Sequence, residues 1–335
     1  MSRMTSRDQY LIDRRHALLG MGALAGVAAF GLAGCSDEEA PAPAGSSSSA
    51  SDGSSEESEG TQIDAAAYDE LVASGPVADD ATIAASTWAT KIKDAGTMRV
   101  GGVQTSMLFC LMNEKDNKVR GFDAGLFQML ANYILGDPDA YELTQVTSNT
   151  RESVLTNDQV DAVFATYSIT DERKEIISFA GPYYTTQQGI LVMADNSDIN
   201  GVDDLAGKNV AAQSGSTGPS VLEEYAPDAN IQEFATDEEA RTALEQGRVD
   251  AYVIDATMQL GAMTRNPGKY RLAGEEFGPV DAYGIGLPHD SDGVAFVNDF
   301  LTTIEQDGTW SELWQVCIGD RADIAEAPEP PAIGA

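Results

Sequence analysis

The sequence predicts an α/β protein built from two lobes. From Ser86 onward, short β-rich runs alternate with helical stretches, which is typical of α/β units around largely parallel sheets. The alternation runs once to about Thr185 and again from Gly189 to about Pro279. Each pass has the length of an ordinary domain. Because ligands prefer the junction between domains, we expect a binding cleft between the two lobes.

The predicted strands are apolar, β-branched runs that lie between turn residues. They read MRVGGV (98–103), YELTQV (141–146), DAVFAT (161–166), GILVM (189–193), NVAAQ (209–213), AYVID (251–255) and YGIGLP (283–288).

The predicted helices carry apolar residues on one face or recognisable caps. The helix over 122–135 has Asp123 as its expected N-cap. A capping box of Thr236 and Glu239 opens the next helix, which ends at Gly247. The last helical stretch, 296–319, is expected to break into a pair at an Asp-Gly step.

The first 34 residues resemble an export signal, with a basic start followed by an apolar, glycine-rich run. A transmembrane helix is the alternative, but the run is short and is followed at once by SDEE. The closing LAGC resembles a bacterial lipobox, which implies cleavage before Cys35 and lipidation of its thiol. The adjacent Arg14 and Arg15 resemble a twin-arginine signal, so the export route stays open. We therefore expect a lipid-anchored protein on the outer face of a bacterial cell membrane.

Two segments are expected to be unstructured. Residues 35–85 begin with acids, serines and prolines and offer little to bury, so they should form a tether, with a short helix possible in 61–85. Residues 321–335 should form a tail.

Composition excludes several classes of function. The net charge of −34 argues against nucleic acid or an anionic lipid surface as a partner, because phosphates would be repelled. The two histidines are His16, in the signal, and His289, in a polar loop, and no metal-ligand cluster or Ser-His-Asp set is apparent. We therefore predict no metal, no cofactor and no enzymatic activity.

Three junctions in the sequence share one pattern, in which an apolar strand ends, polar residues follow and a helix begins. They are ATYSITDER (165–173), AAQSGSTGPS (211–220) and AYVIDATM (251–258). In α/β sheets the crevice beyond the carboxyl ends of the strands binds ligands, and helix N-termini there attract anions. Capping is the commonest role for such residues taken singly. The three junctions favour a ligand site only when they are taken together with the family resemblance described below.

The residues at these junctions suit the two charged ends of a free amino acid. Arg173 can bind a carboxylate through two parallel hydrogen bonds, and Asp255 suits an ammonium group. Hydroxyl groups can add further hydrogen bonds, and they come from Ser168, Thr170, Ser216 and Thr217.

Motifs between Gly96 and Gly319 resemble the polar amino-acid-binding proteins of bacterial ABC importers, the type 3 extracellular solute-binding family. They include GFDAGL, VTSNTRESVL, DAVFATYSITDERKEIISFAGPYY, GRVDAYVID and DGTWSELW. The resemblance implies a two-lobed periplasmic-binding-protein fold of type II. Residues 86–185 and 284–320 would form lobe 1, and residues 186–283 would form lobe 2. Hinge strands are expected near 184–188 and 280–284.

The resemblance also implies roles for individual residues. Arg173 would bind the α-carboxylate, helped by N–H groups around Ser216 and Thr217. Thr166, Ser168 and Asp255 would take the α-ammonium or line its pocket.

Specificity is inferred from VTSNTR (146–151). Ser148 and Arg151 occupy positions that meet the side-chain carboxylate in glutamate- and aspartate-binding relatives, so glutamate is favoured over aspartate and glutamine. The alternative is that Arg151 caps or forms a salt bridge on a helix face. Many relatives place an aromatic ring from the segment after the first strand against the ligand. Here that segment reads GGVQTSMLFCLM (101–112), so either Phe109 or Met107 takes this role or the stacking is absent.

The resemblance predicts a binding protein that delivers its amino acid to permease and ATPase subunits. A sensor that presents the ligand to a receptor, or a dehydratase on the same fold, are the alternatives. Cys110 and Cys317 both fall in lobe 1 and in an oxidising compartment, so they could form a disulfide.

Overall fold

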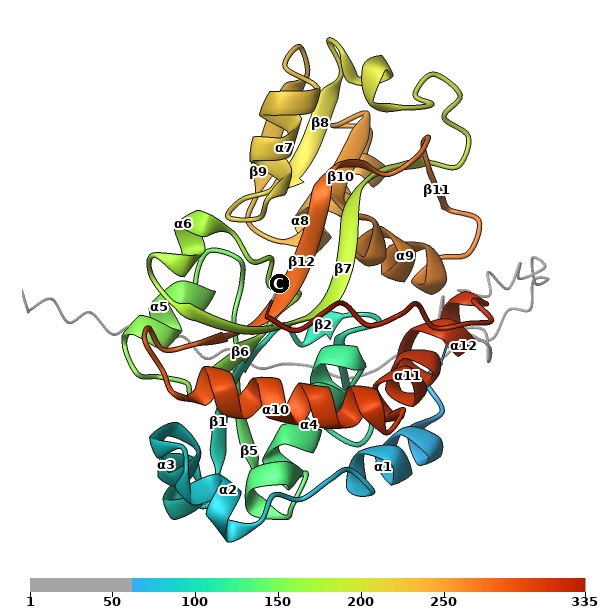
Figure 1. Cartoon of the computed structure of the whole chain (residues 1–335). Helices are drawn as coiled ribbons and strands as arrows, with labels where there is room; N and C mark the ends of the chain where they lie inside the picture. The colour runs from blue at the N-terminus through green and yellow to red at the C-terminus, as the bar shows by residue number, and fades with distance from the viewer. Residues whose placement is uncertain (1–61, 335) are drawn as a thin grey trace, which may run out of the picture. The chain divides into compact units, whose positions relative to one another are not determined.

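The structure, a computed structural model, describes residues 62–334 (Figure 1). The predicted export signal, the lipidation of Cys35 and most of the predicted tether lie outside the described residues. Within residues 62–334, no helix is long and apolar enough to cross a membrane.

A mixed sheet of nine strands organises this part of the chain. Eight of its strands follow one another in the order β5-β1-β6-β12-β7-β10-β8-β9, and β11 pairs with β7 outside this path. A small antiparallel sheet, β2-β3-β4, lies apart from it. The strands are β1 (Met98–Gly102), β2 (Thr105–Ser106), β3 (Cys110–Asn113), β4 (Lys118–Arg120), β5 (Tyr141–Gln145), β6 (Ala162–Phe164), β7 (Ser178–Met193), β8 (Asn209–Gln213), β9 (Asn230–Phe234), β10 (Ala251–Asp255), β11 (Tyr270–Leu272) and β12 (Phe277–Leu287).

The strand order divides the sheet into two halves, which belong to two lobes. On one side β5, β1 and β6 run parallel, and on the other side β10, β8 and β9 run parallel. The antiparallel pair β7 and β12 joins the halves and runs through both of them (Figure 1). In the middle of this pair Ala282 faces Thr185, and a bulge interrupts the register near Tyr283. The expected hinge stretches, 184–188 and 280–284, therefore lie where the two long strands pass between the lobes.

Helices pack against the strands of both halves of the sheet. They are α1 (Ala65–Ala73), α2 (Asp80–Ala84), α3 (Thr87–Ala95), α4 (Phe122–Leu135), α5 (Arg151–Thr156), α6 (Asp171–Lys174), α7 (Gly218–Tyr225), α8 (Asp237–Glu245), α9 (Ala256–Arg265), α10 (Gly293–Gln306), α11 (Thr309–Trp314) and α12 (Asp320–Ala322), with a 3₁₀ turn at Val202–Leu205 and a π turn at Gln315–Gly319.

Helix α4 is the centre of the lobe 1 core, and almost every residue in it is buried. The turn before it requires glycine, because Gly121 has φ +140° and a Cβ there would lie 2.4 Å from the backbone carbonyl of Phe109. Gly121, and not Asp123, is the N-cap of α4. Our N-cap prediction was wrong because the buried carboxylate of Asp123 serves other partners. It accepts hydrogen bonds from the Thr166 N–H and the Tyr183 hydroxyl.

The folded part is longer at both ends than we expected. In α1, which lies in the predicted tether, Tyr68 is 1% exposed, and its hydroxyl donates to Gln128 of α4 at 2.9 Å. In the predicted tail, the Gly334 N–H donates to the Gly181 carbonyl at 2.8 Å. Ile333 packs against the lobe 1 core. A few apolar side chains thus suffice to hold segments whose average composition is that of a linker.

Cys110 and Cys317 are both buried in the lobe 1 core as free thiols. The structure therefore does not contain the disulfide that we considered. Burial raises the pKa of both thiols, so they remain protonated and unreactive in the folded protein.

Candidate functional site

A cavity of about 440 Å³ lies between the lobes and is lined by residues of both. Lobe 1 contributes the loop before β2, the segment after β5, the start of α5 and the end of β6. Lobe 2 contributes the loop after β8, the start of α8 and the end of β10. Six of the predicted site residues line it, namely Ser148, Arg151, Thr166, Ser168, Ser216 and Asp255. These residues come from the three sequence junctions and from the VTSNTR segment.

The guanidinium group that lines this cavity belongs to Arg151. It is the first residue of α5 and is 3% exposed. Its Nη1 donates to the Ala165 carbonyl at 3.2 Å, and its Nη2 donates to the Gly215 carbonyl at 3.4 Å, whereas its buried Nε has no hydrogen-bond partner. Burial, followed by the nearby charge of Arg173, lowers the pKa of Arg151 to about 10. The group stays charged at neutral pH without a carboxylate bonded to it.

Arg173 lies beside the cavity and is not among the residues that line it. Its Nη1 donates to the Ser168 carbonyl at 2.7 Å, and its Nη2 donates to the Gly215 carbonyl at 2.9 Å. Its Nε lies 3.7 Å from Glu152. Arg173 therefore links lobe 1 to the loop of lobe 2 that holds Gly215.

The Gly215 carbonyl accepts hydrogen bonds from both arginines. Asn149 adds a further contact between the lobes, because its side-chain amide donates to the Ser214 hydroxyl at 2.7 Å. Gly215 has φ +73°, and a Cβ there would lie 2.4 Å from the Asn149 side chain. Only glycine allows this close approach of the two lobes.

Asp255 ends β10 and is 6% exposed. Its carboxylate accepts hydrogen bonds from the Gln188 amide at 2.6 Å and the Tyr283 hydroxyl at 2.5 Å. Burial, together with the neighbouring charge of Asp281, raises the pKa of Asp255 to about 7. The carboxylate thus lines the cavity in a setting that disfavours its charged form.

The remaining predicted hydroxyl residues divide between capping and the cavity. Thr170 caps α6, since its hydroxyl accepts from the Arg173 N–H at 3.3 Å, and it does not line the cavity. Ser216 lines the cavity, but its hydroxyl is engaged locally with the Gln213 carbonyl. Thr217 lies outside the lining set, and its hydroxyl donates to Asp281 at 2.9 Å.

Thr166 has an unusual backbone conformation at the cavity wall. Its φ is +42°, which is rare for a β-branched residue. The conformation lets its N–H donate to the buried carboxylate of Asp123 at 2.9 Å. Asp123 also lines the cavity, and burial raises its pKa to about 6.

Sequence reasoning missed several acidic residues near the site. The sequence pattern predicts only a helix cap for Asp123 and only a hinge position for Asp281. It places Asp237 and Glu238, at the start of α8, in a capped helix without a role in binding, yet they line the cavity. The repeated pattern of a strand followed by a helix that opens on polar residues would have pointed to α8.

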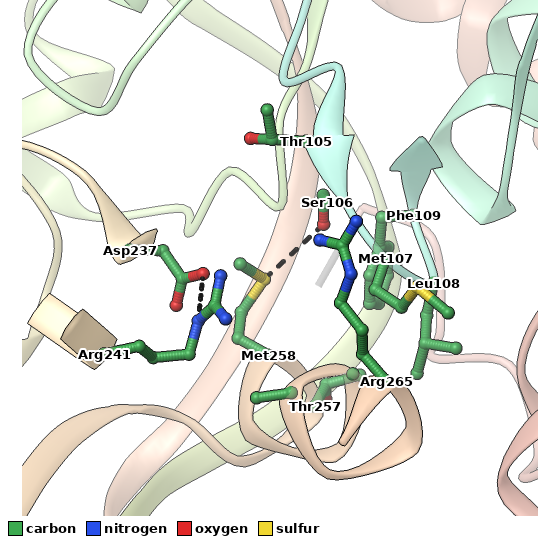
Figure 2. Close-up of a pocket in the computed structure, with 12 residues that line it drawn as sticks. Thr105, Ser106, Met107, Leu108, Phe109, Asp237, Arg241, Thr257, Met258 and Arg265 are labelled. Atoms are coloured by element: carbon green, nitrogen blue, oxygen red, sulfur yellow. Dashed lines mark hydrogen bonds and ion pairs between the residues drawn. The ribbon is translucent and has the colours of Figure 1, made fainter. Parts of the chain in front are cut away.

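No aromatic side chain lines the cavity within residues 62–334. Phe109 is buried in the core, edge-on to Phe122 and Tyr184. Met107 lines a smaller space of about 20 Å³ where β2 and the loop after it meet α8 and α9 (Figure 2). In this contact between the lobes the Ser106 hydroxyl lies 3.8 Å from the Met258 sulfur. Neither candidate for a stacking residue lines the cavity.

Comparison with known proteins places this architecture in a family. Residues 98–319 match the model of bacterial extracellular solute-binding proteins, family 3. A glutamine-binding protein of Geobacillus stearothermophilus is 39% identical over 206 residues, which cover 61% of this chain and 78% of that protein. The glutamate-binding protein GluB of Corynebacterium glutamicum is 32% identical over 230 residues, which cover 65% and 78%.

A solved structure has the same fold. The solute receptor for L-cysteine of Neisseria gonorrhoeae superposes with a TM-score of 0.68 at 23% identity, over 73% of this chain and 99% of that one. The two-lobed type II periplasmic-binding-protein fold and the matched family model lead to one conclusion. The chain belongs to family 3 of the bacterial extracellular solute-binding proteins, the amino-acid-binding proteins of ABC importers.

Proposed function

We propose that this protein binds glutamate in the cavity between its lobes and delivers it to an ABC permease at the outer face of the cell membrane. In this function the amino acid is carried and not transformed. Aspartate and glutamine are the competing ligands, and the glutamine-binding relative makes glutamine the stronger of the two.

The observation that carries this proposal is the buried, unpartnered Nε of Arg151 at the cavity wall. A buried donor without an acceptor is costly, and a charged one more so. A ligand carboxylate would satisfy the Nε and neutralise the guanidinium group. A neutral amide could accept one hydrogen bond but would leave the charge uncompensated, which favours glutamate over glutamine.

The positively charged α-ammonium group of the ligand also has a partner of opposite charge in the same cavity. Asp255, at the carboxyl end of β10, suits the α-ammonium group, and Ser168 of lobe 1 lines the same cavity. An amino acid held in this way would contact both lobes, so its binding would favour the closed arrangement.

Arg173 would support binding from just outside the lined space. We assign it to the α-carboxylate, which it would reach by exchanging a bond to the Ser168 or Gly215 carbonyl for one to the ligand. A charged acceptor forms a stronger hydrogen bond than a neutral carbonyl.

Titration calorimetry with glutamate, glutamine and aspartate tests the proposal. We expect glutamate to bind most tightly. We expect Arg151→Met to weaken glutamate binding by at least about 2 kcal/mol, the scale for losing one partner of a buried charge pair. The same change should weaken glutamine binding less. Arg173→Ala should weaken all three ligands by a similar amount.

Lys174→Ala is the matched control, because Lys174 follows Arg173 in α6 but its ammonium group is exposed and 3.7 Å from Asp171. It should leave every affinity unchanged. Tighter binding of glutamine than of glutamate, or a loss of both to the same extent in Arg151→Met, would overturn the assignment of glutamate. Loss of glutamate uptake in cells lacking the protein would support its role in delivery.

A further inference from the structure

The hinge region holds two buried carboxylates that belong to different strands. Asp255 ends β10 in lobe 2, and Asp281 lies on the hinge strand β12. They are 6% and 9% exposed. Asp255 lines the ligand cavity, whereas Asp281 does not. Nothing in the family resemblance or in the motifs gives Asp281 a role.

A continuous chain of hydrogen bonds joins the two carboxylates. The Gln188 amide, on hinge strand β7, donates to Asp255 at 2.6 Å and to the Thr217 hydroxyl at 3.2 Å. The Thr217 hydroxyl in turn donates to Asp281 at 2.9 Å. The same atoms therefore connect both hinge strands with the start of α7.

Each carboxylate also has a partner outside this chain. The Tyr283 hydroxyl, on the same strand as Asp281, donates to Asp255 at 2.5 Å. Ser168 of lobe 1 forms a side-chain hydrogen bond with Asp281. Every partner of the two carboxylates is thus electrically neutral.

The charged groups around the pair do not neutralise it. The charge of Arg151 on α5 lowers the pKa of both carboxyl groups, and the charge of Arg173 on α6 lowers that of Asp281. Within residues 62–334, however, neither carboxylate forms an ion pair with a basic side chain. Tyr283 of β12 is the other titratable group in contact, and Gln188 of β7 and Thr217 of α7 are neutral.

Two like charges at this depth oppose each other. Burial raises the pKa of both carboxyl groups, and the charge of Asp281 raises that of Asp255 further. Hydrogen bonds from Ser168 and Thr217 act in the opposite direction on Asp281. Such a pair releases its protons in two well-separated steps.

We propose that Asp255 and Asp281 share one proton in the ligand-free protein, and that the ammonium group of the bound amino acid displaces this proton into solvent. The inference rests on the proposed function, because it requires an ammonium group at Asp255. No covalent bond is formed. The ligand stays a cation at its amino end and the pair becomes a dianion that the ammonium neutralises in part.

The shared proton would make the affinity for glutamate depend on pH in a range where free glutamate itself does not titrate. Below about pH 7 the proton must be removed before the ammonium group can pair with Asp255. The dissociation constant should therefore rise by about tenfold for each unit by which the pH falls. Above about pH 8 it should be nearly constant. An importer using this protein would thus capture its ligand less well in acidic surroundings.

Calorimetry in two buffers tests the proposal directly. Glutamate binding at about pH 6 is measured in phosphate, which has a small ionisation enthalpy, and in Bis-Tris, which has a larger one. The difference between the observed heats gives the number of protons released. We expect close to one proton per ligand at about pH 6 and close to none at about pH 8.

The Asp281→Asn variant tests whether the proton release depends on the pair of carboxylates. Asparagine keeps an oxygen that can accept the Thr217 hydroxyl but removes the charge that raises the pKa of Asp255. We expect fewer protons released at about pH 6 and a flatter pH dependence, with affinity at about pH 8 changed by less than about threefold. Asp290→Asn is the control, because it removes an exposed carboxylate that lies outside both the cavity lining and the hydrogen-bond chain. It should leave the proton count unchanged.

The outcomes separate this inference from the proposed function. If no amino acid binds, the proposed function fails. If glutamate or glutamine binds with the same heat in both buffers at about pH 6, the proposed function stands and the shared proton is refuted. Because that second result comes from the unmodified protein, it holds even if Asp281→Asn fails to fold.

Discussion

The guanidinium carbon of Arg151 lies 3.9 Å above the centre of the Tyr167 ring. Arg173 lies over the same ring at 5.3 Å. One aromatic side chain therefore contacts both arginines at the edge of the ligand cavity. Tyr167 is itself held in place, because its hydroxyl donates to Glu152 at 2.6 Å and its ring packs against Phe179. The ring provides a fixed surface for two like charges that would otherwise repel each other.

Replacing this ring should weaken ligand binding without removing either charge. We expect Tyr167→Leu to lower glutamate affinity by about five- to thirtyfold, the range of a desolvated cation–π contact. Tyr167→Phe keeps the ring and loses only the bond to Glu152, so its affinity should stay within about threefold of the original. Calorimetry on the two variants makes the comparison. Equal losses would show that the hydroxyl, and not the ring, positions the arginines.

The turn into α4 should not tolerate a side chain. Gly121→Ala would bring a Cβ to 2.4 Å from the Phe109 carbonyl at a φ of +140°, so we expect the free energy of unfolding to fall by about 3 kcal/mol. Gly201→Ala is the control, since a Cβ there meets nothing within 4 Å. Urea denaturation measures both. A similar stability for the two variants would contradict the steric argument.

The stability of the ligand-free protein should be greatest near pH 5. Burial raises the pKa of Asp123 and Asp255, so the stability associated with their neutral forms is lost as the pH rises through about 6 to 7. Hydrogen bonds, the first from the Lys118 N–H, lower the pKa of Asp116, and this contribution is lost only in stronger acid. We expect the free energy of unfolding to be larger at about pH 5 than at about pH 8 by at least about 1 kcal/mol. Urea titrations that show stability rising steadily over this range would refute the prediction.

The thiols of Cys110 and Cys317 should not react with a thiol reagent until the protein unfolds. Cys110 and Cys317 are free and buried, and burial raises the pKa of each. A chromogenic disulfide reagent should therefore label neither residue in the native, unreduced protein and both after denaturation. Failure of both to react after denaturation would mean that they form a disulfide after all.

Much of the fold could be predicted from the sequence, because many of its strands and helices are indicated by patterns among neighbouring residues. Strands such as 209–213 and 251–255 are short apolar runs between turn residues, and the structure places β8 and β10 at those positions. The hinge strands were harder to predict. β7 begins at Ser178 and crosses Gly181, Pro182 and two threonines before the apolar run at 189–193. Such a strand is stabilised by its pairing with β12, which no local pattern reports.

The sequence by itself determined the two-lobed α/β architecture, the three polar junctions and the residue types that suit an amino acid, because periodicity and strand-to-helix transitions are properties of neighbouring residues. Tertiary structure decided which of those residues share a space. It set Arg151 at the cavity wall and Arg173 beside it, and it left Thr170 as a cap. It also connected Asp281 of the hinge to Asp255 through the Thr217 hydroxyl and the Gln188 amide. These relations join positions far apart in the chain, and they depend on how the two halves of the sheet meet at β7 and β12.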